Sequence, residues 1–276
     1  MMGMFMTAIG VWVSVLGGPD SPAREAAQDS LVVSGQVQDV AKAVYENNWR
    51  TREGLIAVLA RMGSVDALAD IATEHVKIDA QRLAIRSLGR MGLADAQVPL
   101  RLLLSSEHRD LAVEALGLVG DSSDILRVRA LLTDERADVR RRAALALAQL
   151  AGDEAIGDLA VLLGDQHHSV RFAVFSSLLS FGYLAVDAVL AVYDGLPVVG
   201  KQLALRLFGQ LRAPSSQAIF EKALASDTQW PIQVAGVRAM AEWEDAKWIP
   251  ILKKAQKEVS SPIVKMAIQD AIKKLQ

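Results

Sequence analysis

Small and aliphatic side chains recur three and four residues apart in short segments that follow one another along most of this chain. Such spacing places side chains on one face of an α-helix, so each segment predicts one amphipathic helix. The aligned segments span 55–63, 84–92, 112–121, 143–153, 174–182, 204–212, 236–245 and 268–276. Their closing residues lie 28 to 32 residues apart, which predicts eight copies of one repeating unit.

The residue that closes each copy predicts how its helix ends. The closing residues are Gly63, Gly92, Gly120, Ala151, Gly182, Arg212, Glu244 and Gln276. Glycine adopts the left-handed backbone conformation without a steric cost, so the four glycines predict left-handed C-caps. Arginine and glutamate close the sixth and seventh copies, which predicts helix ends that differ from the others.

Further helical patterns between the copies predict a second helix in each unit. They span 65–75, 95–104, 124–132, 155–163, 184–193, 215–224 and 246–259. A helix pair of about 30 residues cannot bury its own apolar face, whereas stacked pairs share one continuous core. The chain is 51% apolar and only 5% aromatic, which suits closely packed helices. We therefore expect an all-α fold, an α-α superhelix of about eight repeats over residues 36–276.

Three of the copies share a motif in which a helix rich in small and aliphatic residues ends in Gly or Gly-Asp, preceded in two of them by Asp-Val-Arg or Ser-Val-Arg. They are Asp138-Val139-Arg140 through Ala151-Gly152-Asp153, Ser169-Val170-Arg171 through Gly182, and Leu111 through Gly120-Asp121. On these residues the chain resembles HEAT-repeat proteins of the short, bilin-lyase-like (PBS lyase HEAT-like) subtype. The resemblance implies an armadillo-like, right-handed α-solenoid and a role in binding.

The first 18 residues contain no charged side chain, and the chain becomes polar directly after them. This pattern predicts a signal peptide or an N-terminal membrane anchor over residues 1–23, followed by a linker over 24–35. The protein would then be exported, periplasmic or tethered to a membrane. No Lys or Arg precedes the apolar segment, so a cytoplasmic protein whose first helix packs on the end of the solenoid is the alternative.

Charge and residue inventory narrow the range of functions. Lys and Arg number 30 against 32 Asp and Glu, for a net charge of −2, which argues against nucleic acid as a partner. There is no cysteine, and the two Glu-His pairs, at residues 74–75 and 107–108, fall at different phases of the repeat. We therefore predict no metal site, no cofactor, no catalytic residues and no enzymatic activity.

A mostly basic series occupies the position eleven residues before each closure. Its members are Arg52, Gln81, Arg109, Arg140, Arg171, Lys201, Gln233 and Lys265. The series could bind an anionic ligand, or it could form hydrogen bonds between successive repeats, as the resemblance to HEAT repeats suggests. We favour the second interpretation, with Asp134 and Asp165 as acceptors.

Positions ten, six and two before each closure share one face of the repeating helix, because they lie four residues apart. In HEAT-like proteins this face is usually concave. Its arginines are our candidate partner-binding residues: Arg61, Arg82, Arg86, Arg90, Arg141, Arg206 and Arg238. An ordinary solvated face would look similar, but arginine outnumbers lysine here, and arginine suits bidentate pairing with carboxylates. Trp230 and Trp248 fall outside the apolar phase of the repeat and are further candidates, as exposed anchors or as packed side chains.

These observations favour a non-catalytic scaffold or adaptor that binds a protein partner with acidic groups along the concave face. A lyase or chaperone subunit resembling the bilin-lyase proteins is the alternative, and it would need a ligand pocket between helices. A HEAT-like nucleic-acid-binding protein is a third hypothesis, which the mixed charge disfavours.

Overall fold

The computed structural model describes residues 2–225 and 227–276, and the side chains from residue 9 onward within those ranges. The described backbone is helical, with short 3-10 helices between some α-helices and no strand. The chain divides into two compact units, Met1–Leu131 and Leu132–Gln276. The predicted all-α fold of stacked helix pairs is confirmed.

The helices of the first unit are α1 (Met2–Leu16), α2 (Pro22–Ser34), α3 (Val37–Glu46), α4 (Trp49–Arg61), α5 (Val65–Glu74), α6 (Ile78–Arg90), α7 (Gln97–Leu103), α8 (Arg109–Val119) and α9 (Ile125–Ala130). Those of the second unit are α10 (Ala137–Ala151), α11 (Ile156–Leu162), α12 (His168–Phe181), α13 (Leu184–Val192), α14 (Val198–Leu211), α15 (Gln217–Ala223), α16 (Trp230–Trp243), α17 (Trp248–Glu258) and α18 (Pro262–Leu275).

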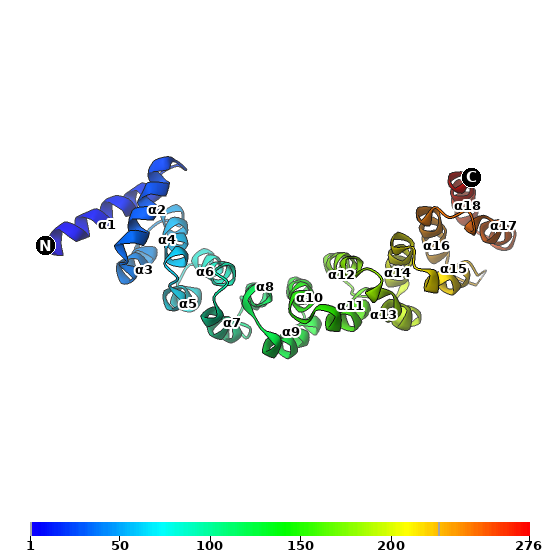
Figure 1. Cartoon of the computed structure of the whole chain (residues 1–276), viewed down its shortest axis with the longest axis horizontal. Helices are drawn as coiled ribbons and strands as arrows, with labels where there is room; N and C mark the ends of the chain where they lie inside the picture. Colours follow the sequence, from blue (N-terminus) through cyan, green and yellow to red (C-terminus); the bar gives the residue numbers. More distant parts are fainter. Residues whose placement is uncertain (1, 226) are drawn as a thin grey trace. The chain divides into compact units, whose positions relative to one another are not determined.

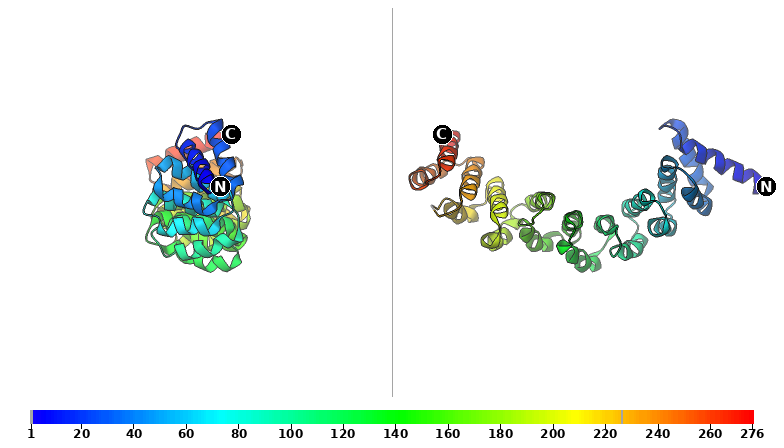
Figure 2. Two further views of the ribbon diagram at one scale, coloured as in Figure 1. Left: turned by 90° about the vertical axis from the view of Figure 1, so that its left-hand side faces the viewer. Right: turned by 180° about the vertical axis from the view of Figure 1, so that it is seen from behind.

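Within each unit the helices alternate between two rows (Figure 1). From α2 onward, even-numbered helices pack on one another in one row, here called the first helices, and include every repeating helix that the sequence predicted. The odd-numbered helices from α3 onward form the other row and are here called the second helices. The view from behind shows the same two rows in each unit (Figure 2). The second helices coincide with the second helical patterns of the sequence to within a few residues.

The ends of the first helices confirm some expectations and correct others. Gly63 and Gly92 have positive φ angles of 71° and 67°, as their predicted C-caps require, whereas Gly182, with φ 62° and ψ −135°, lies outside the left-handed helical conformation. Gly120 instead is extended, with φ −68° and ψ 171°, so the predicted left-handed cap is wrong there. Arg212 and Glu244 adopt the left-handed conformation, with φ of 51° and 58°, so their helices end as at a glycine. The prediction that these two ends differ is therefore wrong.

Glycines three residues before two of the closures let neighbouring first helices approach closely. A methyl group placed on Gly89 of α6 would lie 2.8 Å from the Cα of Ala115 of α8. One placed on Gly209 of α14 would lie 2.7 Å from the carbonyl oxygen of Ala239 of α16. Any side chain at these positions would force the helices apart, because interiors are packed to crystal-like density.

Residues 24–35, which we expected to be a linker, lie mainly in α2. This helix begins with the Ser21 N-cap and Pro22, packs on α4, and buries Ala27 and Leu31. It ends at Gly35, whose φ is 66°, one repeat length before Gly63. The linker assignment is wrong, because α2 has its own apolar face and extends the row of first helices by one member.

The N-terminal apolar segment forms α1, which packs on α2 and α4. Val13 and Leu16 are buried, and Leu16 fills the space beside Gly54 of α4. No helix in the described residues has the length and apolar character needed to span a membrane. The signal peptide, the membrane tether and export stay predictions.

Candidate partner-binding surfaces

Two arginines of the basic series link successive repeats as predicted, whereas Arg171 donates to the main-chain oxygens of Asp165 and Gln166, just before its own helix. Arg52 of α4 donates from Nη2 to Oδ2 of Asp79 in α6, at 2.9 Å. Arg140 of α10 forms a bidentate pair with Asp165, from Nε at 2.7 Å and from Nη2 at 2.9 Å. Both arginines are buried, so these side chains join adjacent repeats and are not available to a ligand.

The same links control two carboxyl pKa values. Burial alone would raise the pKa of Asp165, but the hydrogen bonds from Arg140 and from the His167 N–H outweigh it and hold that pKa below its ordinary value. Burial would likewise raise the pKa of Asp79, but the hydrogen bond and charge of the Arg52 guanidinium outweigh it and lower that pKa. Both carboxylates are therefore ionised partners of the arginines at neutral pH. Asp134, the other expected acceptor, receives Arg140 Nη1 on its main-chain oxygen, at 2.8 Å.

Three candidate arginines lie on one exposed face of α6. Arg86 and Arg90 are exposed and Arg82 is half-buried, and the three are four residues apart along the helix. Among the described side chains, none of the three guanidinium groups has an ion-pair or hydrogen-bond partner. Like charges one turn apart repel by about 0.2–0.5 kcal/mol per pair, so this row is a local cost to α6.

The remaining candidate arginines are in different environments. Arg61 of α4 is paired, because its Nη2 lies 2.6 Å from Oδ1 of Asp29 in α2. In the second unit, Arg206 of α14 stacks over the Phe175 ring of α12, with its guanidinium carbon 5.3 Å from the ring centre. Arg141 is half-buried. The predicted set is thus divided between the two units and is not a single uniform surface.

The two candidate tryptophans differ in burial. Trp230, at the start of α16, is 50% exposed. Trp248, at the start of α17, is fully buried, with its ring centre 5.3 Å from that of Phe220 and 5.1 Å from that of Trp243. Its assignment as an exposed partner contact is therefore wrong. The aromatic cluster closes the core of the last repeats, and Lys247 covers its rim, 4.3 Å from the Trp243 ring centre.

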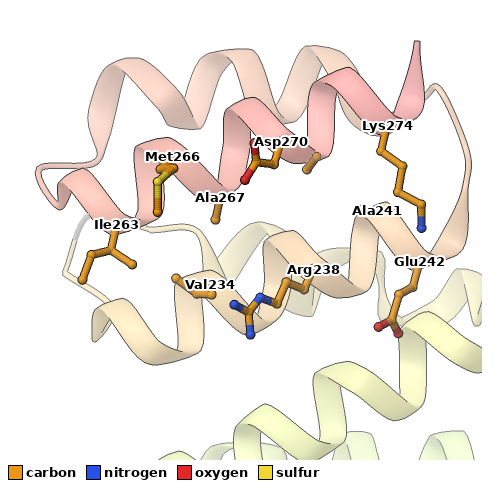
Figure 3. Close-up of a pocket in the computed structure, with 10 residues that line it drawn as sticks. Val234, Arg238, Ala241, Glu242, Ile263, Met266, Ala267, Asp270 and Lys274 are labelled. Carbon is orange, nitrogen blue, oxygen red and sulfur yellow. The ribbon is translucent and has the colours of Figure 1, made fainter.

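A groove of about 330 Å³ lies between α16 and α18 (Figure 3). Its apolar part is formed by Val234, Ala241, Ile263, Met266, Ala267 and Ala271. Charged side chains of both signs line the rest, namely Arg238, Glu242, Asp270 and Lys274. Of the predicted site residues, Arg238 lines this groove, and Trp230 lies one helical turn before Val234 on the same helix.

The histidines have structural roles. Nδ1 of His75 accepts from the main-chain N–H of Lys77 at 2.9 Å, and His108 lies 2.8 Å from the side-chain oxygen of Gln81. His167 is the N-cap of α12 and accepts from the N–H of Ser169. Within the described residues, no group of three His, Cys, Asp or Glu side chains is arranged to hold a metal ion.

Reasoning from the sequence missed the part that α2 plays in these surfaces. Arg24 stands eleven residues before Gly35, at the position of the basic series, and its Nη2 donates to the main-chain oxygen of Arg50 at 3.2 Å. Asp29 stands six residues before Gly35, a position of the same face on which Arg61 stands two residues before Gly63, and it neutralises Arg61. The repeat spacing from Gly63 back to Gly35 was the signal that could have found both.

Part of the chain matches a known protein family. Residues 125–199 match the family model for HEAT repeats. Residues 125–199 therefore carry HEAT repeats. The matched HEAT repeats include two of the motifs on which the resemblance rested, those at residues 138–153 and 169–182. No curated protein sequence matches this chain.

Several solved structures are similar to this chain. The Escherichia coli protein YibA is 15% identical, with a TM-score of 0.51, over 94% of this chain and 98% of that one. The complex of CpcE and CpcF of phycocyanin lyase from Nostoc sp. PCC7120 is 15% identical, with a TM-score of 0.41, over 94% and 96%. Human deoxyhypusine hydroxylase is 17% identical, with a TM-score of 0.37, over 99% and 98%. At these identities the likeness to YibA shows the fold alone.

Proposed function

We propose that this protein is a non-catalytic scaffold that binds an acidic segment of a partner protein on the face of the first helices, at α6. The observation that carries the proposal is the row of Arg82, Arg86 and Arg90, which has no acidic partner among the described side chains. On the neighbouring helix α4, by contrast, Arg61 is already neutralised by Asp29. A partner's carboxylates would supply at α6 the counter-charge that the chain itself supplies at α4.

The spacing of the row suits a regular peptide. Successive arginines lie about 6 Å apart along the axis of α6, at about 1.5 Å per residue. Alternate residues of an extended strand are about 6.6 Å apart, and residues one turn apart on a helix match the row directly. A segment with a carboxylate at every second position when extended, or every fourth when helical, could therefore contact all three guanidinium groups. Arginine favours carboxylates because its planar donors can pair with both oxygens.

A charge-reversal experiment tests this proposal. The probe is a fluorescent peptide of about a dozen residues with alternating Glu and Ser, and the readout is anisotropy at increasing salt. We expect the protein to bind the probe, and the variant R82E/R86E/R90E to lose binding while its free energy of unfolding changes by no more than about 1 kcal/mol per residue. The matched control is K253E/K254E/K257E, which reverses three exposed charges on α17 and should bind as the wild type does.

Two outcomes would overturn the assignment. If the α6 variant unfolds while the α17 control does not, the arginines serve the fold. If both variants bind the probe with the wild-type affinity and salt dependence, the face at α6 is an ordinary solvated surface, and the groove between α16 and α18 is the surface to test next.

A further inference from the structure

A second, oppositely charged surface lies on the second helices of the first unit. A groove of about 450 Å³ runs between α3 and α5. Its apolar lining comes from Val37 and Ala41 of α3 and from Ala67 and Ile71 of α5. The predicted partner surface on the first helices includes none of these residues.

Three carboxylates line the α5 side of the groove. Asp66, Asp70 and Glu74 lie four residues apart and are all exposed. Within the described part of the chain, none of the three has an ion-pair or side-chain hydrogen-bond partner. Lys42 also lines the groove, from α3, but its Nζ lies 3.9 Å from the Glu46 carboxylate. The α5 rim therefore carries three uncompensated negative charges that repel one another.

Partial burial and the negative charges of this rim both raise the pKa of Tyr45. The ring lies in the groove, 44% exposed, and packs at a tilt against the buried His75, with 4.5 Å between ring centres. Partial burial raises the pKa of the Tyr45 hydroxyl, and the charges of Glu74 and Asp70 raise it further. An aromatic side chain beside carboxylates offers a cation both a ring face and counter-charges.

The acidic surface continues into an adjoining hollow of about 400 Å³. The two hollows share Val37, Asp66 and Ala67, and the second adds the exposed carboxylate of Asp95. The surface thus has an apolar floor along its length and carboxylates along one side.

We propose that the groove between α3 and α5 binds a basic amphipathic segment of a partner protein, with cationic side chains on the α5 carboxylates and aliphatic side chains on the apolar floor. The carboxylates lie about 6 Å apart along α5, which matches lysines or arginines one helical turn apart in the bound segment. Such a helix in a groove buries its apolar face while its charges set the register.

Other occupants fit less well. Carboxylates spread along a helix at about 6 Å intervals cannot converge on one metal ion, whose oxygen ligands lie at about 2.0–2.6 Å. Nucleic acid and anionic lipid are repelled by the rim. A second copy of this chain could offer the arginines of α6, but α6 is held between α4 and α8 and cannot insert an apolar side into the groove.

A synthetic helix tests the proposal. The probe is a labelled peptide of about 16 residues, long enough for about four helical turns, with lysine and leucine each repeated every fourth residue on adjacent stripes. We expect binding that weakens with salt and is absent for the same peptide with glutamate in place of lysine. The variant D66K/D70K should weaken binding by about tenfold or more, and the neutral variant D66N/D70N by less.

The matched control is D187K/E258K, which makes the same change of net charge on second helices of the other unit and should leave binding unchanged. The folding and the association state of each variant are checked by circular dichroism and sedimentation velocity.

The proposal is overturned if D66K/D70K folds and binds the lysine peptide as tightly as the control does. It is also overturned if the wild type self-associates through this surface, so that D66K/D70K converts a dimer to a monomer, because the occupant is then a second copy. Loss of the α6 interaction with acidic peptide leaves this result unaffected, since the two probes and surfaces are separate.

Discussion

Removing Arg140 tests the claim that the basic series stabilises the fold and does not bind a ligand. In the structure Arg140 makes a bidentate pair with Asp165 and donates from Nη1 to the main-chain oxygens of Asp134 and Glu135, at 2.8 and 3.0 Å. The side chains of Arg140 and Asp165 are only 7% and 6% exposed. Breaking a buried pair from one side costs about 3–5 kcal/mol, since the remaining charge is left without its partner. Asp165 keeps the hydrogen bond from the His167 N–H, at 2.7 Å, so we expect Arg140→Met to cost about 3–4 kcal/mol.

The measurement is urea unfolding followed by far-ultraviolet circular dichroism at neutral pH. Arg141→Met is the control, because it removes the neighbouring guanidinium, which has no ion pair with another described residue, and should cost about 0.5 kcal/mol or less. The double variant R140M/D165N should cost less than the sum of the two single changes, because it leaves no buried charge. If Arg140→Met costs no more than Arg141→Met, the series does not stabilise the repeats and the interpretation of these contacts is wrong.

The same pair predicts a dependence on pH. The pKa of Asp165 is lower in the folded protein than its ordinary value of 3.8. A lowered carboxyl pKa contributes stability that is fully present above the unfolded value and is lost as the pH falls through the folded value. The difference in unfolding free energy between the wild type and Arg140→Met should therefore be constant from neutral pH down to about 5, and should shrink below about 4. A difference that stays constant into that acidic range would contradict the assigned ion pair.

Two further predictions concern stability. Trp248→Ala should lower the free energy of chemical unfolding by about 3–5 kcal/mol, because it empties a buried site between Phe220 and Trp243. The control Trp230→Ala should lower it by less than about 1 kcal/mol. Equal losses would contradict the burial of Trp248. The variant Arg212→Gly should be more stable than Arg212→Ala by about 1 kcal/mol. Both variants lose the ion pair to Glu244, but only alanine is strained at a φ of 51°. Equal thermal midpoints of the two variants would contradict the left-handed cap.

The sequence by itself determined the repeat and the elements within it. Apolar residues three and four apart must face a neighbouring helix in every copy, so the pattern predicted the helices from α4 onward and the phase of the exposed face, although it missed α2 and α3. The link between Arg140 and Asp165 also followed from the sequence, because a charged residue recurring at one phase of a stacked repeat meets its counterpart in the next repeat.

Tertiary structure alone decided features that depend on neighbours. The left-handed end at Arg212 opposes the residue's own preference, so it forms only because the packed helices before and after it require that turn. Trp248 is buried because Phe220 and Trp243 from other helices surround it, and no local spacing encodes that meeting. Whether an arginine is neutralised depends likewise on which carboxylate the adjacent helix presents, as Asp29 does for Arg61. The order of residues determines the helical periodicity directly. The ion pairing and burial of a side chain depend on which residues of other helices lie beside it, and those neighbours are set only when the helices have stacked.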